Sequence, residues 1–275
     1  PQRIVDMYAE KNIPAPVVGD WCADMPIDGH PELHPTAAKG NFGIDYAKNS
    51  RKYYYASITF IDEQVGRIME ELKKKGMYDE ALICFVADHG DMLGDHNMWR
   101  KTYAYEGSAA IPFIIKLPEK MEGGLKKGEV LEQPVELRDL LPTFLDMNHQ
   151  KVPEDMDGAS LLPLLQKEKC IWRKYIDIEH STAYWEDNYW CALTDGKIKY
   201  IWFFRTGQEQ LFDLVKDPHE LNDVSGSCSY RGILKKMRQA MINHLKERGE
   251  EWVKDNRLMI RNQNLLYSPN YPKQK

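Results

Sequence analysis

The sequence lacks an apolar run long enough to cross a membrane, and it lacks the cysteine spacing of a metal or disulfide framework. A spanning helix needs roughly 20 consecutive apolar residues, and the 275 residues contain no such run. The five cysteines are scattered and never spaced as Cys-x-x-Cys, so we expect neither a zinc ribbon nor a disulfide scaffold. A net charge of -5 gives no reason to expect nucleic acid or an anionic membrane as a partner. A secretory leader is also absent, but the sequence begins with Pro1 rather than Met, so this absence does not bear on export.

Chemically useful residue types are concentrated directly after one apolar segment. Residues 81–87 read Ala-Leu-Ile-Cys-Phe-Val-Ala and predict a strand buried on both faces, as in a parallel sheet. Asp88 and His89 follow, at the strand end where open parallel sheets bind their ligands. A carboxylate and an imidazole there suit a divalent cation such as Ca²⁺ or Mg²⁺. Two neighbouring residues cannot complete such a site, and a structural Asp-His-Gly turn explains the same spacing.

Lys101 closes the same run, which reads Gly-Asp-His-x-x-x-x-Lys from residue 94. An ammonium beside a bound cation would suit a tetrahedral oxyanion, because it can neutralise charge on a leaving oxygen. A solvated lysine in a loop is the alternative, since that is the usual environment of lysine.

The remaining pattern predicts an α/β region followed by a smaller α+β region. We expect a helix over residues 49–75, a strand over 110–117, a helix over 135–147 kinked at Pro142, and a short helical piece over 159–166. Four β-prone runs and a long helix come next, which predicts an antiparallel sheet with one helix. These segments are residues 175–180, 189–194, 198–204, 209–214 and 230–249.

Two stretches carry little periodicity. Residues 12–41 predict a long irregular loop, and residues 255–275 an extended tail. Within the loop, His30 and His34 form a tempting pair for a metal. We interpret them as surface-loop residues, because Pro31 and Pro35 disfavour the continuous helix that would present both rings.

Several motifs in this order resemble the type I sulfatase family of the alkaline phosphatase superfamily. The likeness covers roughly residues 1–224, and the last fifty residues are the least diagnostic. The motifs are Asp-His-Gly-Asp-x-Leu-Gly-Asp-His-x-x-x-x-Lys from residue 88, Tyr-Glu-Gly-Ser-Ala-Ala-Ile-Pro-Phe-Ile-Ile from 105, Asp-Leu-Leu-Pro-Thr-Phe-Leu from 139, Asp-Gly-Ala-Ser-Leu-Leu-Pro-Leu-Leu from 157, Leu-Thr-Asp-Gly-Lys-Ile-Lys-Tyr from 193 and Leu-Phe-Asp-Leu-x-x-Asp-Pro-x-Glu from 211.

The resemblance implies the architecture. Residues 1–168 would form the C-terminal part of the α/β catalytic domain, with an alkaline-phosphatase-like mixed sheet and flanking helices. Residues 169–275 would form the smaller α+β subdomain, with a four-stranded antiparallel sheet, a helix and the tail.

The resemblance also implies the site. It makes Asp88 a ligand of a divalent cation, most simply Ca²⁺, and places His89 where the family contacts the metal or the sulfate. Lys101 matches the lysine that touches the sulfate and its leaving oxygen. His96 is assigned to the substrate pocket or to its support. His180 is a candidate substrate contact, and a hydrogen-bonded loop histidine is the alternative reading.

One element of the family pattern is missing from the sequence. The family nucleophile is a formylglycine made from Cys/Ser-x-Pro/Ala-x-Arg, whereas Cys22 precedes Ala-Asp-Met and Cys170 precedes Ile-Trp-Arg-Lys. We therefore expect the C-terminal portion of an arylsulfatase-like sulfuric ester hydrolase, whose formylglycine lies in a missing N-terminal half. Alone, it would be inactive and would expose sheet edges and apolar surface. The partners would be that half and a sulfated small molecule or glycan, and the family resemblance favours a periplasmic or secreted location.

Two other functions stay open from the sequence. A phosphodiesterase or phosphonate monoester hydrolase of the same superfamily would carry similar Asp-His-Gly and Lys elements. A non-catalytic fragment that binds anionic glycans would need no nucleophile.

Overall fold

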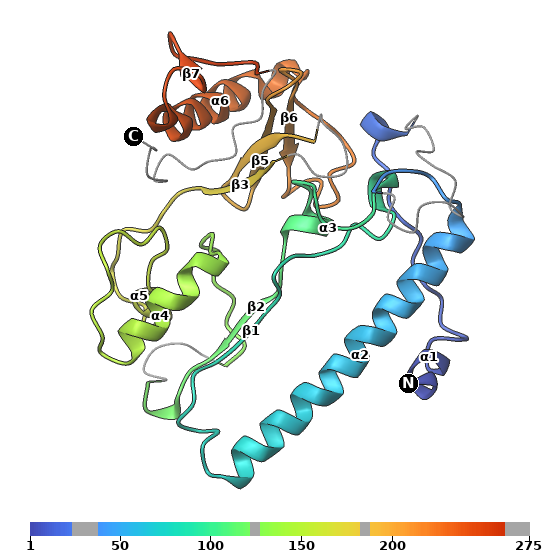
Figure 1. The fold of residues 1–275 in the computed structure, drawn as a ribbon, viewed down its shortest axis with the longest axis vertical. Coiled ribbons are helices and arrows are strands. Elements are labelled where there is room, and N and C mark those ends of the chain that lie inside the picture. Colours follow the sequence, from blue (N-terminus) through green and yellow to red (C-terminus); the bar gives the residue numbers. More distant parts are fainter. Residues whose placement is uncertain (24–37, 122–126, 182–187, 262–275) are drawn as a thin grey trace, which may run out of the picture. The chain divides into compact units, whose positions relative to one another are not determined.

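The computed structural model describes residues 1–23, 38–121, 127–181 and 188–261 (Figure 1). His30 and His34 lie outside the described residues, as does the end of the predicted tail. The chain divides into two compact units. The first comprises Pro1–Ala15, Gly43–Asp88 and Ile111–Lys174, and the second comprises Pro16–Phe42, His89–Ala110 and Tyr175–Lys275. The predicted division at residue 168 is continuous in sequence, whereas these units interleave, because residues 89–110 pack with the later part of the chain.

The first unit begins with two helices, α1 (Gln2–Asp6) and α2 (Ile44–Lys74). Arg3 joins them, since its Nη1 lies 2.7 Å from Oε1 of Glu63. The predicted helix over residues 49–75 is confirmed and begins five residues earlier, directly after Gly43, whose φ of 88° is a glycine conformation. Its apolar stripe is exposed in this chain, with Ile61 and Ile68 exposed by 52% and 60%.

Strands β1 (Ile83–Val86) and β2 (Phe113–Lys116) pair in an antiparallel ladder, with Cys84 opposite Ile115. The prediction of a strand buried on both faces, as in a parallel sheet, is wrong for this pair. Phe85 is 40% exposed and Ile114 is 62% exposed. A continuous apolar run indicates a capacity for burial on both faces, but it carries no information on the direction of the neighbouring strand.

Among the described residues between β2 and residue 174 lie four short helical elements. They are η3 (Glu119–Met121), η4 (Leu137–Asp139), α4 (Leu140–Met147) and α5 (Leu162–Leu165). The predicted helix over residues 135–147 is divided into η4 and α4, and Pro142 lies in the first turn of α4, where its missing N–H costs no intrahelical hydrogen bond.

Asp139 explains two of the motifs in this region. Its side chain is fully buried, and it accepts hydrogen bonds from the Ala159 N–H at 2.9 Å and from Arg173 Nη1 at 2.7 Å. A Cβ added at Gly158 would lie 1.9 Å from the Arg138 carbonyl oxygen, so only glycine permits this approach of the two segments.

The second unit contains the predicted antiparallel sheet, in the order β3-β4-β5-β6, and the predicted long helix. Asp195 and Gly196 form the turn between β4 and β5, and Gly196 has a φ of 81°. A short hairpin follows the helix. The elements are β3 (Ile176–His180), β4 (Trp190–Thr194), β5 (Ile198–Phe203), β6 (Glu209–Asp213), η5 (Cys228–Tyr230), α6 (Arg231–Leu245), η6 (Lys246–Arg248), β7 (Val253–Lys254) and β8 (Arg257–Leu258).

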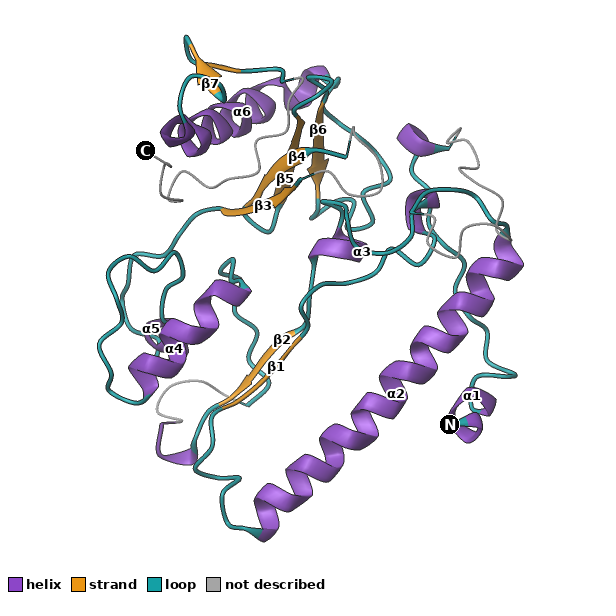
Figure 2. Cartoon of the chain, viewed as in Figure 1, coloured by secondary structure: helices purple, strands orange, loops and turns teal. Residues whose placement is uncertain are grey.

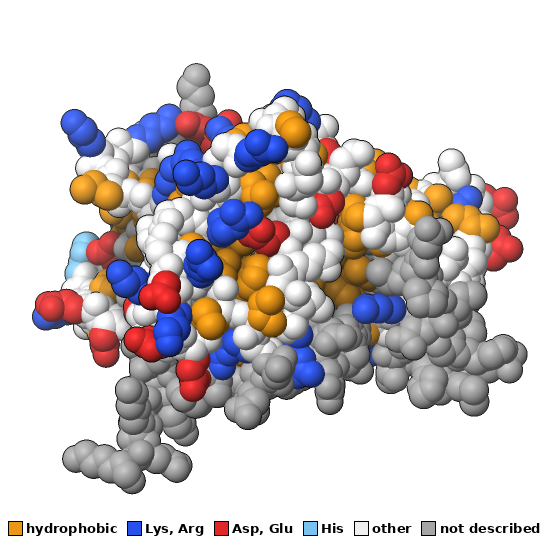
Figure 3. Space-filling model, turned by 90° about the horizontal axis from the view of Figure 1, so that it is seen from above, with side chains coloured by type: hydrophobic (Ala, Val, Ile, Leu, Met, Phe, Trp, Pro, Cys, Tyr) orange, Lys and Arg blue, Asp and Glu red, His pale blue; other side chains and the backbone are white. Residues whose placement is uncertain are grey.

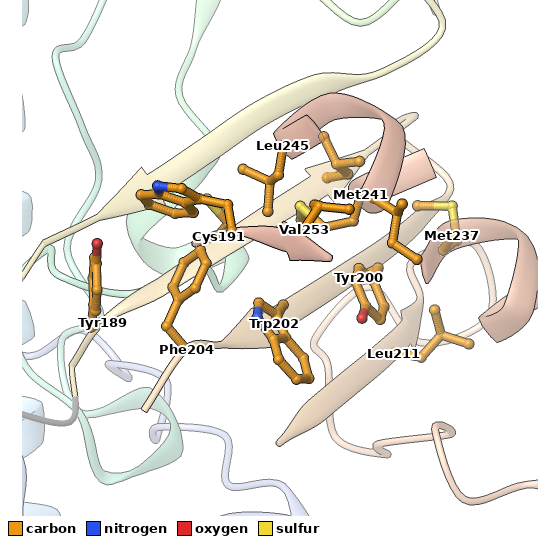
Figure 4. Close-up of a cluster of buried hydrophobic side chains, with 13 residues drawn as sticks. Tyr189, Cys191, Tyr200, Trp202, Phe204, Leu211, Met237, Met241, Leu245 and Val253 are labelled. Carbon is orange, nitrogen blue, oxygen red and sulfur yellow. The ribbon is translucent and has the colours of Figure 1, made fainter. Parts of the chain in front are cut away.

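Both faces of this sheet are covered, because successive residues of a strand point to opposite faces. On one face, Met237, Met241 and Leu245 of α6 pack against side chains that include Tyr200 and Leu211 (Figure 4). On the other face, side chains of residues 92–105 pack against the intervening positions of the strands, a cluster that includes Met92, Tyr103, Tyr105, Trp190, Ala192, Ile201 and Phe212. Residues 92–105, which carry part of the sequence motif that begins at Asp88, thus pack on the sheet of the second unit.

Charged side chains are interspersed on the face shown in Figure 3, where Lys and Arg lie among Asp, Glu and apolar side chains. The net charge of -5 is therefore not expressed there as a surface of one sign. Within the described part of the chain, no helix combines the length and the apolar character that a membrane span requires.

Candidate active site

The motif loop, defined here as residues 89–110, is almost entirely irregular backbone between β1 and β2 (Figure 2). Its only helical pieces are η2 (Asp95–Asn97) and α3 (Glu106–Ala109). Apolar burial holds the loop in place, since Met92 is fully buried and Tyr103 and Tyr105 are each 4% exposed. The ring of Tyr105 meets Phe212 of β6 edge-on at 5.9 Å. The loop is irregular in shape but has the packing of a core segment.

Asp91 closes the turn that precedes Lys101. Its Oδ1 accepts hydrogen bonds from the backbone N–H groups of Leu93 at 2.9 Å and Arg100 at 3.1 Å. The Met92 N–H donates to the Arg100 carbonyl at 2.9 Å. Between these ends, four residues other than glycine have positive φ values, namely Leu93, His96, Asn97 and Arg100. Such backbone costs free energy and persists only where surrounding bonds impose it.

Gly90 permits the loop to close on itself. Its N–H donates to the Ser108 carbonyl at 2.8 Å. A Cβ added at Gly90 would lie 2.2 Å from the Gly107 carbonyl oxygen, far inside van der Waals contact. The glycine of Asp-His-Gly is therefore required by this close approach of two backbone segments.

Asp88 and His89 carry a carboxylate and an imidazole, two groups that can act as ligands of a divalent cation. Asp88 is exposed, and His89 is half-buried. The His89 Nδ1 lies 2.7 Å from the carbonyl oxygen of Gly90, so Nδ1 carries the proton and donates it. In the neutral ring this leaves the lone pair on Nε2, the arrangement common among metal-ligating histidines.

The number of donors is smaller than a cation requires. Ca²⁺ takes about six to eight oxygen ligands. Within the described ranges, no group of three or more His, Cys, Asp and Glu side chains is placed to hold a metal ion. Asp88 and His89 fall in different compact units. The two side chains are of a kind that a cation binds, but among the described residues they do not make a full set of ligands.

Lys101 lies on the surface directly after the turn closed by Asp91. Within the part of the chain that the structure describes, its ammonium group makes no hydrogen bond and no ion pair. A lysine in this state can accept an anion without breaking an existing interaction.

His96 lies inside the second unit rather than on its surface. It is 2% exposed, its Nδ1 accepts the Gly19 N–H at 3.2 Å, and the ring donates to the backbone carbonyl of His219. Burial lowers its pKa, although the nearby Asp95 carboxylate opposes this shift. The ring is therefore neutral at pH 7 and holds three segments together. Of the two roles predicted for His96, the geometry favours support of the pocket.

His180 ends β3 and is half-buried. Its Nδ1 lies 2.9 Å from the Asn188 carbonyl oxygen, and its ring stacks on Trp190 at a centroid distance of 5.9 Å. These contacts resemble those of the hydrogen-bonded loop histidine that the sequence left open. A substrate contact by His180 stays a prediction.

A buried ionic cluster that the sequence motifs did not reveal is formed by Glu106, Lys199 and Glu220. Lys199 is fully buried and Glu220 is 1% exposed. The signal was present in the strand Ile-Lys-Tyr-Ile-Trp-Phe, where position 199 shares a face with Ile201. A lysine on that buried face requires a carboxylate partner.

Comparison with known proteins decides the family. Residues 11–149 match the family described as Sulfatase, and residues 94–247 match the one described as N-sulphoglucosamine sulphohydrolase, C-terminal. The chain belongs to the sulfatase family. It is 39% identical to an arylsulfatase of Clostridium perfringens over 259 residues, which cover 94% of this chain and 53% of that protein. The predicted membership in the sulfatase family and its α/β fold are confirmed.

Two solved structures are similar to this sulfatase chain. One is a protein in complex with its substrate D-glucosamine-2-N,6-O-disulfate, with a TM-score of 0.64 and 27% identity over 78% of this chain and 44% of that one. The other is a phosphonate monoester hydrolase from Silicibacter pomeroyi, with a TM-score of 0.66 and 28% identity over 86% of this chain and 48% of that one. The chain thus spans about half the length of the relatives it matches.

Proposed function

We propose that this chain supplies the C-terminal part of a sulfatase that hydrolyses sulfate esters of carbohydrates. The single observation that carries the proposal is Lys101, which lies in the motif loop of a chain of the sulfatase family and whose ammonium group has no hydrogen-bond or ion-pair partner among the described residues. The carbohydrate class is supported by the similar protein solved with a glucosamine disulfate.

In this proposal, Asp88 and His89 provide two of the ligands of a divalent cation, most simply Ca²⁺. A cation held there would supply neutralisation of charge on the sulfate oxygens. Lys101 binds the same sulfate and stabilises the leaving oxygen as the ester bond breaks. His96 keeps the loop in place, and His180 stays a candidate contact of the sugar.

The nucleophile, a formylglycine, would lie in an N-terminal half outside this chain. Apolar surface supports such a partner, since Ile58, Ile61 and Ile68 of α2 and Ile114 of β2 are each at least half exposed. Monomeric surfaces rarely leave a stripe of this kind uncovered. Alone, the chain would bind cation and anion without turnover. A periplasmic or secreted location rests on the family resemblance alone.

The test compares this chain alone with a longer protein, expressed from a gene that also includes the coding segment upstream of Pro1. We expect no turnover of 4-nitrophenyl sulfate by the chain alone, and turnover by the longer protein. Lys101→Met should abolish the activity of the longer protein, whereas Lys235→Met, a change at an exposed lysine of α6, should not. Clear turnover by the chain alone, or activity that survives Lys101→Met, would refute the proposal.

A phosphonate monoester hydrolase is the second candidate, favoured by the similar structure from Silicibacter pomeroyi. The same longer protein should be offered phenyl phosphonate monoesters in parallel. A higher kcat/KM on the phosphonate than on the sulfate would favour this candidate. A third outcome would identify a non-catalytic glycan-binding fragment. In that case neither ester is turned over, and the affinity for a sulfated glycan is unchanged by alanine substitutions at Asp88 and His89.

A further inference from the structure

The buried ionic cluster joins three segments that are distant in sequence. Lys199 lies on β5, Glu220 in the turn after β6, and Glu106 at the start of α3 in the motif loop. The Lys199 Nζ lies 2.6 Å from Oε1 of Glu106 and 2.7 Å from Oε1 of Glu220. The second oxygen of Glu220 accepts the backbone N–H of Glu106 at 2.7 Å. Glu220 therefore binds both the lysine and the backbone of the loop.

Because the cluster is buried, it favours the one loop position in which Glu106 contacts Lys199. Removing a lysine from water is costly unless carboxylates replace the lost hydration, and Lys199 is fully buried. Burial raises the pKa of Glu220, and the charge and hydrogen bond of Lys199 oppose that rise. Glu106 remains 37% exposed in its side chain, so it closes the cluster toward solvent. If the loop moved away, Lys199 would lose one of its two carboxylate partners.

The turn that carries Glu220 holds other parts of the site as well. The Glu220 carbonyl accepts the Trp21 Nε1–H at 2.8 Å, and the His219 carbonyl accepts a hydrogen bond from the His96 ring. The loop is thus fastened at His96 and again at Glu106. In the sequence, Lys101 lies midway between these two attachment points.

We propose that Lys199 and Glu220 are positioning residues that fix the segment 96–106 from beneath, so that Lys101 presents its ammonium to a sulfate ester from one place. The inference rests on the proposed function for the role of Lys101, whereas the fixation of the loop rests on the contacts alone. Lys199 acts on the loop through its ion pair with Glu106, and Glu220 acts through Lys199 and through the backbone N–H of Glu106. This assigns a purpose to two motifs, at residues 193–200 and 211–220, that the chemistry of the site leaves unexplained.

The test measures hydrogen exchange of this chain as wild type, as Lys199→Met and as Glu106→Ala. In Lys199→Met, peptides covering residues 89–110 should exchange about tenfold faster or more, since charge-assisted bonds are lost and the loop opens locally. Peptides of α6, on the other face of the sheet, should keep their wild-type rates. Glu106→Ala should show a smaller effect in the same peptides, and it guards against misfolding because Lys199 keeps Glu220 as a partner.

The matched control is Arg238→Met. Arg238 of α6 pairs with Glu209 of the edge strand β6 through its Nε at 2.5 Å. This change should leave peptides 89–110 at wild-type rates. Equal acceleration of the loop in Arg238→Met, uniform acceleration across the second unit in Lys199→Met, or no acceleration in either Lys199→Met or Glu106→Ala would overturn the proposal.

A second measurement separates this inference from the proposed function. The affinity for inorganic sulfate is measured by calorimetry for wild type, Lys199→Met and Lys101→Met. Weaker sulfate binding in Lys199→Met, with the exchange of α6 unchanged, supports the positioning of Lys101. Loss of a residue that only stabilises the fold would not change the affinity for sulfate in this way. If wild type binds no sulfate, the role of Lys101 fails, and the exchange data alone still decide whether the cluster fixes the loop.

Discussion

Replacement of Asp91 by alanine should loosen the turn that precedes Lys101. The change removes the acceptor of two backbone N–H groups, at 2.9 Å from Leu93 and 3.1 Å from Arg100. A hydrogen bond to a charged group contributes about 1.5–3 kcal/mol, so two bonds at the lower end give about 3 kcal/mol. Asp91 is half-buried and water can replace part of the loss, so we expect the second unit to lose about 2 kcal/mol of unfolding free energy.

Two further variants sharpen this prediction. Asp91→Asn keeps an oxygen acceptor at the same place and should cost less than about 1 kcal/mol. Asp195→Ala is the matched control, because Asp195 Oδ1 likewise accepts two backbone N–H groups, from Lys197 at 3.0 Å and Ile198 at 2.8 Å. It should cost as much stability as Asp91→Ala, but it should leave sulfate affinity unchanged, since its turn joins β4 to β5.

The assay is urea unfolding followed by tryptophan fluorescence. Of the seven tryptophans, five are described residues of the second unit, so the signal reports mainly on that unit. Calorimetry with inorganic sulfate supplies the second readout. The reasoning is refuted if Asp91→Ala unfolds within about 0.5 kcal/mol of wild type, or if Asp195→Ala weakens sulfate binding as much as Asp91→Ala does.

Three other predictions follow from the same geometry. Gly90→Ala should unfold at clearly lower urea and lose activity in the longer protein, because its Cβ would lie 2.2 Å from the Gly107 oxygen; wild-type stability would contradict this close approach. Burial lowers the pKa of His96, so the unfolded chain binds more protons below about pH 6.5 and stability should fall as the pH drops through that value; unfolding midpoints from about pH 7.5 to 5.5 should fall less in His96→Gln. Native protein should react with a thiol reagent at Cys170 and Cys228, which are exposed, while burial raises the pKa of the other three thiols; labelling mapped by mass spectrometry would expose any other pattern.

Local pattern was enough for much of the secondary structure. The stripe of α2, the four runs of the antiparallel sheet and the Asp195-Gly196 turn were each predicted from a few neighbouring residues. Periodicity and turn chemistry are properties of a short segment, so a single sequence contains them. For the same reason, Asp88, His89 and Lys101 could be named as candidates from one run of the chain.

Pairing between distant segments could not be predicted in the same way. The apolar run of β1 predicted burial but not its antiparallel neighbour β2. Exposed apolar surface was expected, but the stripe of α2 could not show that it is part of that surface. The assignment of residues 89–110 to the second unit also depends on packing against β4, β5 and β6.

The sequence by itself determined the family motifs, the types of residue at the candidate site and the absence of a formylglycine motif. The tertiary structure decided which contacts several of the motif residues make. It made Gly90 a point of close backbone approach, Asp91 the acceptor that closes a turn, and Lys199 the buried partner of Glu106 and Glu220. The physical reason is that burial and charge pairing depend on which segments meet, and a one-dimensional pattern does not contain those meetings.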